Sequence, residues 1–180
     1  RAELATGRWD AAIDASGYVP RVVRASAALL AERVDRYLFV SSISVYAPPS
    51  EAGLDEAATV GTLDDPATEE VGKFYGPLKY ACERVVEDVF GARATNVRPG
   101  LIVGPHDATD RFGYWVARFV HPRLLGERPS RAVVPAPRER PLQFVDARDL
   151  AAWLVELCER GVGGTFNACS PAGEWTMSDL

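Results

Sequence analysis

The sequence predicts an α/β fold built on a doubly wound parallel sheet, because short β-rich apolar runs alternate with helical patterns along the chain. Residues 9–16 (WDAAIDAS) predict a buried strand, and residues 19–34 follow it with apolar side chains at helical spacing. Residues 36–42 (RYLFVSS) predict a second buried strand. A helix that opens near Tyr75 then leads to a third strand at residues 94–104. The predicted order is therefore β-α-β-α-β.

The rest of the chain has looser patterns. Between Tyr46 and Phe74 the sequence is acidic and proline-rich without clear periodicity, which indicates a surface excursion. Asp146 or Asp149 is expected to cap an amphipathic helix that Gly161 closes. The elements predicted after residue 104 are a helix at 110–125, extended pieces at 131–137 and 141–146, the amphipathic helix at 147–161 and a last strand at 164–170.

Length and composition indicate one soluble domain. A chain of 180 residues with 47% hydrophobic content is large enough to bury a core, and none of its apolar runs approaches the roughly 18 residues that a membrane span needs. The net charge of -5 argues against nucleic acid as a partner. The cysteines Cys82, Cys158 and Cys169 lie far apart, so they indicate neither a disulfide framework nor a zinc site and favour the cytoplasm.

Tyr75 and Lys79 stand four positions apart in a chain where lysine is scarce, since only two of its 20 basic residues are lysines. A chance Tyr-x-x-x-Lys is expected roughly 0.07 times in such a chain. Pro77 favours a helix start here, which puts both side chains on one helical face. A nearby ammonium favours phenolate and makes the phenol usable in proton transfer. A buried tyrosine beside a solvated lysine explains this pair alone equally well.

Ser41 and Ser42 stand where the second predicted strand ends. In parallel α/β sheets, ligands bind beyond the carboxyl ends of the strands, so a hydroxyl there can reach a substrate oxygen. Small serines also commonly end a strand and begin a turn, and this alternative stays open for the pair by itself. The serines, the Tyr-x-x-x-Lys pair and RPGLIVGP (98–105) occur in that order, and the combination favours a catalytic site.

Six segments carry a resemblance to a known family: DASGY (14–18), FVSSISVYA (39–47), YGPLKYACE (75–83), VRPGLIVGP (97–105), RPLQFVDARDLA (140–151) and GTFNACSP (164–171). Through them the sequence resembles the short-chain dehydrogenase/reductase superfamily, specifically the extended type of the NAD-dependent epimerase/dehydratase family. The resemblance covers nearly the whole chain. It implies a Rossmann-like fold and a nicotinamide cofactor, NAD or NADP.

The resemblance also implies roles for three residues. In that family the tyrosine of the motif is the general acid/base, the lysine orients the nicotinamide ribose and lowers the tyrosine pKa, and a serine or threonine holds the substrate oxygen. Carried over, these residues are Tyr75, Lys79 and Ser42, the last standing four positions before Tyr46. The implied reaction is hydride transfer between a substrate carbinol carbon and the nicotinamide, which an epimerase uses transiently.

Further contacts follow from the same resemblance. The residues expected beside the cofactor are Ala15, Ser16, Gly17, Ser41, Tyr75, Lys79, Pro99 and Gly100. Weaker candidates for substrate contacts are Ser44, His106, Arg111 and Arg140. A guanidinium such as that of Arg140 suits the phosphate of a nucleotide sugar. No metal ligand set is indicated.

We expect residues 1–104 to form the C-terminal half of a dinucleotide-binding domain. Residues 105–180 are expected to be mainly a substrate-binding part, from which residues 142–170 return to the nucleotide-binding core. The sequence holds no Gly-rich phosphate loop, because GVGG at 161–164 follows a helix. We therefore expect a fragment, incomplete at the N-terminus, that binds dinucleotide poorly and is inactive alone.

Two classes of function stay open. The first is an NAD(P)-dependent oxidoreductase or epimerase that acts on a small molecule such as a nucleotide sugar. The resemblance implies a homodimer for it, because the helix bearing the tyrosine often lies at a dimer interface in the family. The second is a non-catalytic relative that binds a nucleotide or RNA. The intact set of Ser42, Tyr75 and Lys79 favours the enzyme, and the acidic balance disfavours RNA.

Overall fold

The structure is a computed structural model that describes residues 4, 6–48, 53–107, 109–120, 137–171 and 173–179. Its central sheet is parallel, with the strand order β1-β2-β3-β7. These strands are β1 (Trp9–Asp14), β2 (Val34–Val40), β3 (Ala94–Pro99) and β7 (Gly164–Ala168).

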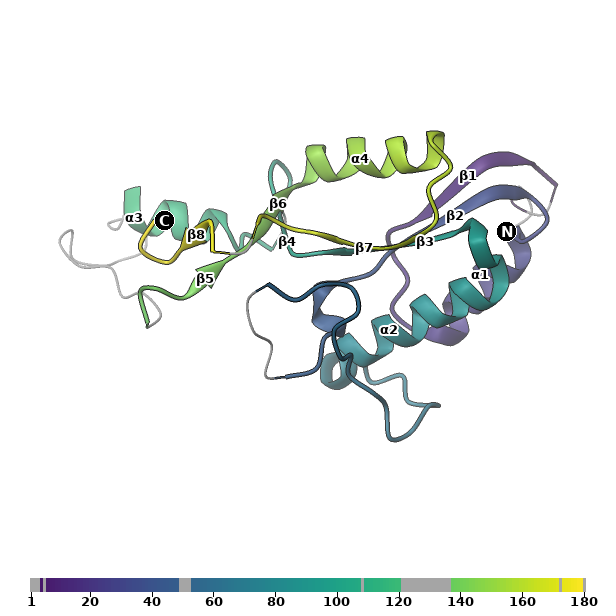
Figure 1. The fold of residues 1–180 in the computed structure, drawn as a ribbon, viewed down its shortest axis with the longest axis horizontal. Helices are drawn as coiled ribbons and strands as arrows, with labels where there is room; N and C mark the ends of the chain where they lie inside the picture. Colours follow the sequence, from purple (N-terminus) through teal and green to yellow (C-terminus); the bar gives the residue numbers. More distant parts are fainter. Residues whose placement is uncertain are drawn as a thin grey trace.

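Helices cover both faces of this sheet (Figure 1). On one face lie α1 (Pro20–Leu30) and α2 (Val71–Phe90), and on the other lies α4 (Ala147–Glu159). The predicted α/β fold with a doubly wound parallel sheet is therefore confirmed. In such a fold the carboxyl ends of the parallel strands meet at one edge, where ligands bind.

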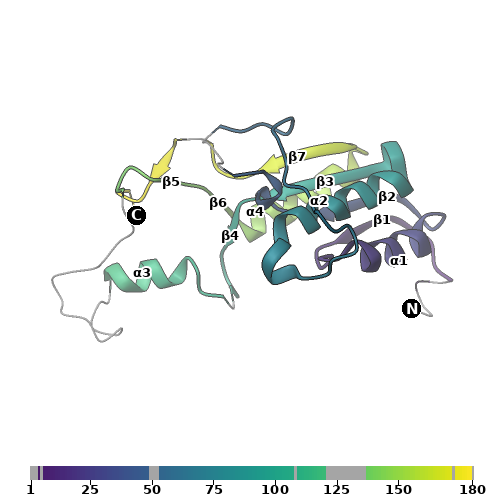
Figure 2. The ribbon, with the colours of Figure 1, turned by 90° about the horizontal axis from the view of Figure 1, so that it is seen from below.

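A second group of elements lies beyond the carboxyl ends of these strands (Figure 2). Strand β4 (Leu101–Val103) pairs in parallel with β6 (Phe144–Asp146), and β5 (Pro141–Leu142) pairs antiparallel with β8 (Trp175–Thr176). Helix α3 (Gly113–Val120) lies at the end of the molecule far from the N-terminus. Aromatic rings join these elements, with Phe112 and Phe144 at 5.4 Å between centroids.

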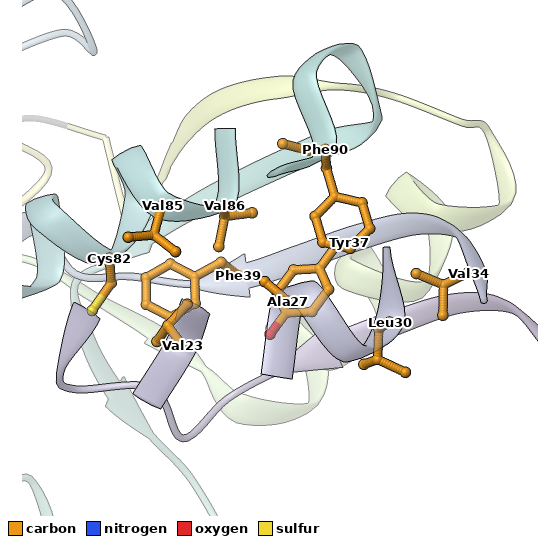
Figure 3. Close-up of a cluster of buried hydrophobic side chains, with 11 residues drawn as sticks. Val23, Ala27, Leu30, Val34, Tyr37, Phe39, Cys82, Val85, Val86 and Phe90 are labelled. Atoms are coloured by element: carbon orange, nitrogen blue, oxygen red, sulfur yellow. The ribbon is translucent and has the colours of Figure 1, made fainter. Parts of the chain in front are cut away.

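The apolar run of β2 explains why both faces are covered, because a strand buried on both sides is hydrophobic at successive positions. Leu38 and Val40 pack against α4, whereas Tyr37 and Phe39 pack against α1 and α2. The Tyr37 ring stacks on Phe90 at 4.7 Å between centroids. Figure 3 shows the cluster of buried side chains between the sheet and helices α1 and α2. It comprises Val23, Ala27, Leu30, Val34, Tyr37, Phe39, Cys82, Val85, Val86, Phe90 and Ala94.

Two predicted strands end earlier than expected. The strand predicted at 94–104 is interrupted at Gly100, whose N–H donates to Ala168 O before β4 leaves the sheet to pair with β6. A Cβ at position 100 would stand 1.7 Å from Gln143 Oε1, so the Gln143 side chain would have to move if residue 100 carried one. The strand predicted at 9–16 ends at Asp14, because the Asp14 carboxylate accepts a hydrogen bond from Ser16 N (3.0 Å) and turns the chain.

The helices largely follow the prediction. Helix α2 begins at Val71, but Phe74 is non-helical (φ -119°, ψ 31°), so its regular part starts near Tyr75 as expected. Asp146 rather than Asp149 caps α4, since its side chain accepts from Arg148 N (2.8 Å). Of the helix predicted at 110–125, α3 covers Gly113–Val120. Residues 121–125 lie outside the described residues, as does the extended piece predicted at 131–137 up to residue 136.

The described part of the excursion after Tyr46, from residue 53 on, lies on the surface, and hydrogen bonds tie it to the sheet. Leu54 O accepts from Asn167 Nδ2 (3.2 Å), and the Glu56 carboxylate accepts from Asn167 N (2.6 Å). Farther on, Glu69 pairs with Arg21 of α1 at 2.7 Å. Over the described ranges, none of the helices combines the length and the apolar character that crossing a membrane requires.

Candidate active site

Strands β1 and β2 end at the same edge, and their ends carry several of the predicted site residues. Gly17 follows β1, Ser41 and Ser42 follow β2, and Pro99 closes β3. Ser41 N donates to Val97 O (2.6 Å), which holds the end of β2 beside β3. Helix α2 brings Lys79 to this edge, because the Lys79 ammonium donates to Gly17 O and to Val40 O, each at 2.7 Å.

Lys79 is the most unusual group of this site, because its side chain is 2% exposed and yet carries an ammonium. The Phe39 ring lies 4.2 Å from its Nζ. Burial lowers the pKa of Lys79 to about 8, while nearby Cys82, Asp14 and Glu83 act in the opposite direction. An ammonium has three hydrogens, and two are used by the backbone carbonyls of two strands. The third can be donated to a ligand.

The two serines use their hydroxyl groups differently. Ser42 Oγ accepts from Ser44 N (3.1 Å) and so caps the 3-10 turn η1 (Ile43–Val45). This bond uses the Ser42 oxygen as an acceptor and leaves its hydroxyl hydrogen to be donated. Ser41 Oγ is buried and has no hydrogen-bond partner in the described part of the chain. A buried hydroxyl without a partner is costly, which indicates that a ligand or a solvent molecule completes it.

Tyr75 is 37% exposed, in contrast to the buried Lys79 one turn later. Its ring stands 6.2 Å from the Tyr18 ring, and the Lys79 ammonium lies 5.2 Å from the same Tyr18 ring. Within the described residues no hydrogen bond joins Tyr75 to Lys79. Gly76 packs closely against the turn after β2, since a Cβ at this position would stand 1.8 Å from Ser44 O. The phenol is therefore presented to solvent beside the serine turn.

Three of the residues predicted beside the cofactor follow β1, whereas Ser41 follows β2 and Pro99 and Gly100 lie at the end of β3. Ala15 and Ser16 are exposed, and with Gly17 they line a cavity of about 270 Å³. Ser16 is held by Asp14, whose carboxylate also accepts from Tyr37 OH (2.9 Å). A Cβ on Gly17 would stand 2.6 Å from Val23 and 2.7 Å from the Phe39 ring, so glycine lets this segment, whose carbonyl accepts from Lys79, pack against both.

The weaker substrate candidates are dispersed. Ser44 is exposed in η1, close to Gly76. His106 is exposed with a positive φ of 68° in the turn after β4, and Arg111 donates to Thr109 Oγ1 (3.0 Å) before α3. Arg140 is exposed before β5. In the ranges that the structure describes, no hydrogen bond links His106, Arg111 or Arg140 to Ser42, Tyr75 or Lys79.

Sequence reasoning missed two features of this edge. Tyr18 contacts both Tyr75 and Lys79, and its place directly after DASG was the available signal. The second is a buried ion pair in which Arg98 of β3 donates to both carboxylate oxygens of Glu83 on α2, at 2.9 and 2.7 Å. Its signal was a charged residue, Arg98, inside a strand predicted to be buried, together with Glu83 one helical turn after Lys79.

These groups fit the nicotinamide end of a dinucleotide. Within the described residues the Ser41 hydroxyl has no partner, Lys79 has a third hydrogen, and Ala15, Ser16 and Gly17 line a cavity at the end of β1. Ribose hydroxyls and a carboxamide are the kinds of group that such donors and acceptors bind. Ser41, Lys79 and the backbone around Gly17 would hold the cofactor, which supplies hydride chemistry when it is bound.

Solved structures with this fold include epimerases and reductases. A candidate epimerase from Burkholderia cenocepacia J2315 matches with a TM-score of 0.73 and 22% identity, over 99% of this chain and 58% of its own. The UDP-N-acetylglucosamine 4-epimerase from Bacillus cereus matches with 0.62 and 20% identity, over 91% of this chain and 57% of its own. RMD from Pseudomonas aeruginosa, complexed with NADPH, matches with 0.63 and 22% identity, over 94% and 64%.

The chain thus spans less than two thirds of the length of each of these structures. No curated protein sequence matches it. The sequence profile of the NAD dependent epimerase/dehydratase family matches residues 14–169, a span that includes Gly17, Ser42, Tyr75 and Lys79. With most of its length inside that match, the chain belongs to the NAD-dependent epimerase/dehydratase family.

Proposed function

We propose that this protein is an NAD(P)-dependent epimerase or reductase that acts at a hydroxyl-bearing carbon of a nucleotide sugar, with Tyr75 as the acid/base. The observation that carries the proposal is the buried Lys79 ammonium, bonded to the carbonyls of Gly17 and Val40 at the ligand-binding edge of the sheet. An ammonium is rarely buried for structural reasons alone, and groups with shifted pKa values gather at functional sites.

Each of the three catalytic candidates has a distinct task. Tyr75 takes the proton of the substrate hydroxyl during oxidation and returns it during reduction, because its exposed phenol can reach a bound ligand. Lys79, one helical turn later, would donate the third hydrogen of its ammonium to the nicotinamide ribose and so hold the cofactor beside Tyr75. Ser42 donates its free hydroxyl hydrogen to the substrate oxygen, where negative charge develops. A bound nicotinamide would supply the hydride chemistry.

The substrate and cofactor classes rest on the relatives. One similar structure is a UDP-N-acetylglucosamine 4-epimerase, and another is complexed with NADPH, which supports a nucleotide sugar and NAD or NADP for this protein. Residues 105–180, apart from the returning 142–170, would bind the sugar nucleotide. A cavity of about 380 Å³ lies between β4, β6 and the end of β7, where Phe112 from this part meets Phe144 and Asp146 of the returning segment. A homodimer through α2 belongs to the same proposal.

A direct test is product analysis with the full-length protein. UDP-N-acetylglucosamine and UDP-glucose would each be incubated with NAD or NADP, and the sugars would be analysed by NMR while absorbance reports the reduced cofactor. We expect conversion of at least one nucleotide sugar that depends on added or co-purified cofactor. A folded protein that converts no nucleotide sugar and changes no absorbance with either cofactor would contradict the proposal.

A further inference from the structure

We propose that Arg98 is a positioning residue for this site: through Tyr46 it fixes the turn that carries Ser42 against the helix that carries Tyr75. The inference rests on the proposed function, and it assigns a role to residues that sequence reasoning did not place in the site. Within the described residues, no hydrogen bond joins Arg98 to Ser42, Tyr75 or Lys79, so its effect passes through Tyr46.

The Arg98 guanidinium is buried, and all three of its nitrogens donate hydrogen bonds. Its Nε and Nη2 donate to the two oxygens of the Glu83 carboxylate at 2.9 and 2.7 Å, a bidentate geometry that fixes the plane of the guanidinium. The side chains of Arg98 and Glu83 are 4% and 1% exposed. Glu83 stands one turn after Lys79 on α2, so the pair locks β3 to the helix that bears the proton-transfer residues.

The fixed guanidinium then holds Tyr46. Arg98 Nη1 donates to Tyr46 OH (3.0 Å), and Tyr46 OH donates in turn to Asn167 Oδ1 (2.7 Å) on β7. The guanidinium also lies 5.1 Å from the centroid of the Tyr46 ring, close enough for a cation-π contact. Arg98 Nη1 bonds Glu56 O as well, at 3.2 Å, which ties the excursion to the same group. Tyr46 is therefore anchored to two strands through a single hydroxyl.

Tyr46 is the residue that closes η1, the turn that begins at Ser42. Its N–H donates to Ile43 O (3.2 Å) within the turn. On the opposite side, Gly76 lies against Ser44 O so closely that no side chain fits between them. The turn is thus held between the Tyr46 anchor and the residue that follows Tyr75. Release of the anchor is expected to loosen Ser42 relative to Tyr75.

A buried ion pair is poor evidence of stabilisation, because desolvation offsets most of its attraction. Apolar side chains of similar size would fill the same space between β3 and α2. They would not hold the hydroxyl of Tyr46, however, since that requires a donor directed at it. The geometry therefore points to placement of the turn as the function of Arg98.

The test uses the full-length protein and the substrate identified by the product analysis. Tyr46→Phe removes only the anchored hydroxyl, and Tyr80→Phe is the matched control, because Tyr80 has no hydrogen bond in the described part of the chain. We expect Tyr46→Phe to lower kcat about tenfold, since small misplacement of catalytic groups is costly, with KM for the cofactor unchanged within about twofold. Tyr80→Phe is expected to match the wild type.

A second variant separates positioning from folding. The double substitution Arg98→Met with Glu83→Leu removes both charges together, so no charge is left buried alone. We expect it to melt within about 5 °C of the wild type but to lose the same kcat as Tyr46→Phe. Adding Tyr46→Phe to this double variant should lower kcat little further, because the anchor is already gone.

Hydrogen exchange gives a readout that does not depend on activity. In Tyr46→Phe the amides of Tyr46, Ala47 and Gly61, which bond within and beside the turn, should exchange about tenfold faster, while those of α4 stay unchanged. Wild-type kcat in Tyr46→Phe, or unchanged exchange of these amides, would overturn the inference. An inactive wild type would instead overturn the proposed function, and exchange would then still decide whether Tyr46 anchors the turn.

Discussion

Lys79 is held by the backbone of two strands, and this arrangement explains how a charge is kept in the core. Its ammonium can only donate hydrogen bonds. It donates to the carbonyl oxygen of Gly17, just after β1, and to that of Val40, at the end of the neighbouring strand β2. The strand ends are in turn joined through the lysine. A single side chain therefore links the predicted cofactor segment after β1 to the serine pair after β2, and orients both toward α2.

The shifted pKa of Lys79 makes a prediction about stability. Its pKa is about 8 in the folded protein, below the value near 10.4 of an unfolded chain. The unfolded chain then binds more protons between about pH 8 and about pH 10.4, so the free energy of unfolding rises with pH across this window. As pH falls through about 8, this contribution is lost.

Urea denaturation of the wild type and of Lys79→Met over this pH range checks the prediction. The difference in free energy of unfolding between the two proteins should grow in favour of the wild type as pH rises from about 8 to about 10. Lost hydrogen bonds to Gly17 and Val40 add an offset that does not vary with pH. A difference that stays constant with pH would show that Lys79 keeps an ordinary pKa.

At the scale of single elements, the start of α2 decides how the site is assembled. The helix is interrupted at Phe74, and Pro77 and Gly76 stand in the turn that follows. Gly76 is buried against the carbonyl of Ser44, whereas Gly72 in the same helix has nothing within 4 Å of an added Cβ. The close approach of α2 to η1 therefore depends on one glycine.

This contrast predicts opposite effects for two similar substitutions. Gly76→Ala should lower the free energy of unfolding by about 1–3 kcal/mol and reduce turnover, because its Cβ would overlap the backbone of Ser44. Gly72→Ala should raise the free energy of unfolding by about 0.5 kcal/mol and leave turnover unchanged, since alanine restricts the unfolded chain. Urea denaturation and steady-state kinetics measure both. Equal behaviour of the two variants would mean that α2 and η1 are not in tight contact.

The helices and strands were predictable where the hydrophobic pattern of the sequence matches the faces that are buried in the fold. The run YLFV in β2 is apolar at every position because helices cover both of its faces, so it could be recognised from sequence. The break at Gly100 could not, because it depends on the pairing of β4 with β6, a strand from a distant part of the chain. The Arg98 and Glu83 pair was equally hidden, since a charge in a sequence does not reveal which partner it meets.

For the site, the sequence predicted which residues take part but not which atoms they contact. The spacing of Tyr75 and Lys79 put both on α2, and the strand-end position of Ser42 put it at the end of β2, whose Val40 carbonyl accepts from Lys79. The sequence did not indicate that Lys79 would be buried on the carbonyls of Gly17 and Val40. Those contacts arise only when β1, β2 and α2 pack together, and backbone atoms carry no sequence signal of their own.

At the scale of the whole molecule, the 180 residues supply one end of a dinucleotide site. They contain no Gly-x-x-Gly-x-x-Gly segment, and their Gly161, Gly163 and Gly164 follow α4 rather than open a helix. Pyrophosphate binding in this type of fold relies on a glycine-rich turn at a helix N-terminus. Lys79, Ser41 and Gly17 would contact only the nicotinamide end.

The 180-residue chain by itself is therefore expected to show no thermal shift with NAD or NADP. Binding that engages the folded state raises the melting temperature, so a shift below about 1 °C at millimolar cofactor would indicate negligible affinity. Differential scanning fluorimetry measures this directly. A clear shift with either cofactor would mean that the contacts at the nicotinamide end suffice for binding without a glycine-rich turn.

The central claim is that Tyr75 transfers the proton, and turnover of Tyr75→Phe in the full-length protein tests it most directly, with Tyr80→Phe as the control. The change removes one hydroxyl from a side chain that is 37% exposed, so the fold and the melting temperature should be retained. We predict that kcat falls by about a hundredfold or more in Tyr75→Phe and stays at the wild-type value in Tyr80→Phe. Wild-type turnover in Tyr75→Phe would contradict the assignment of Tyr75 as the acid/base.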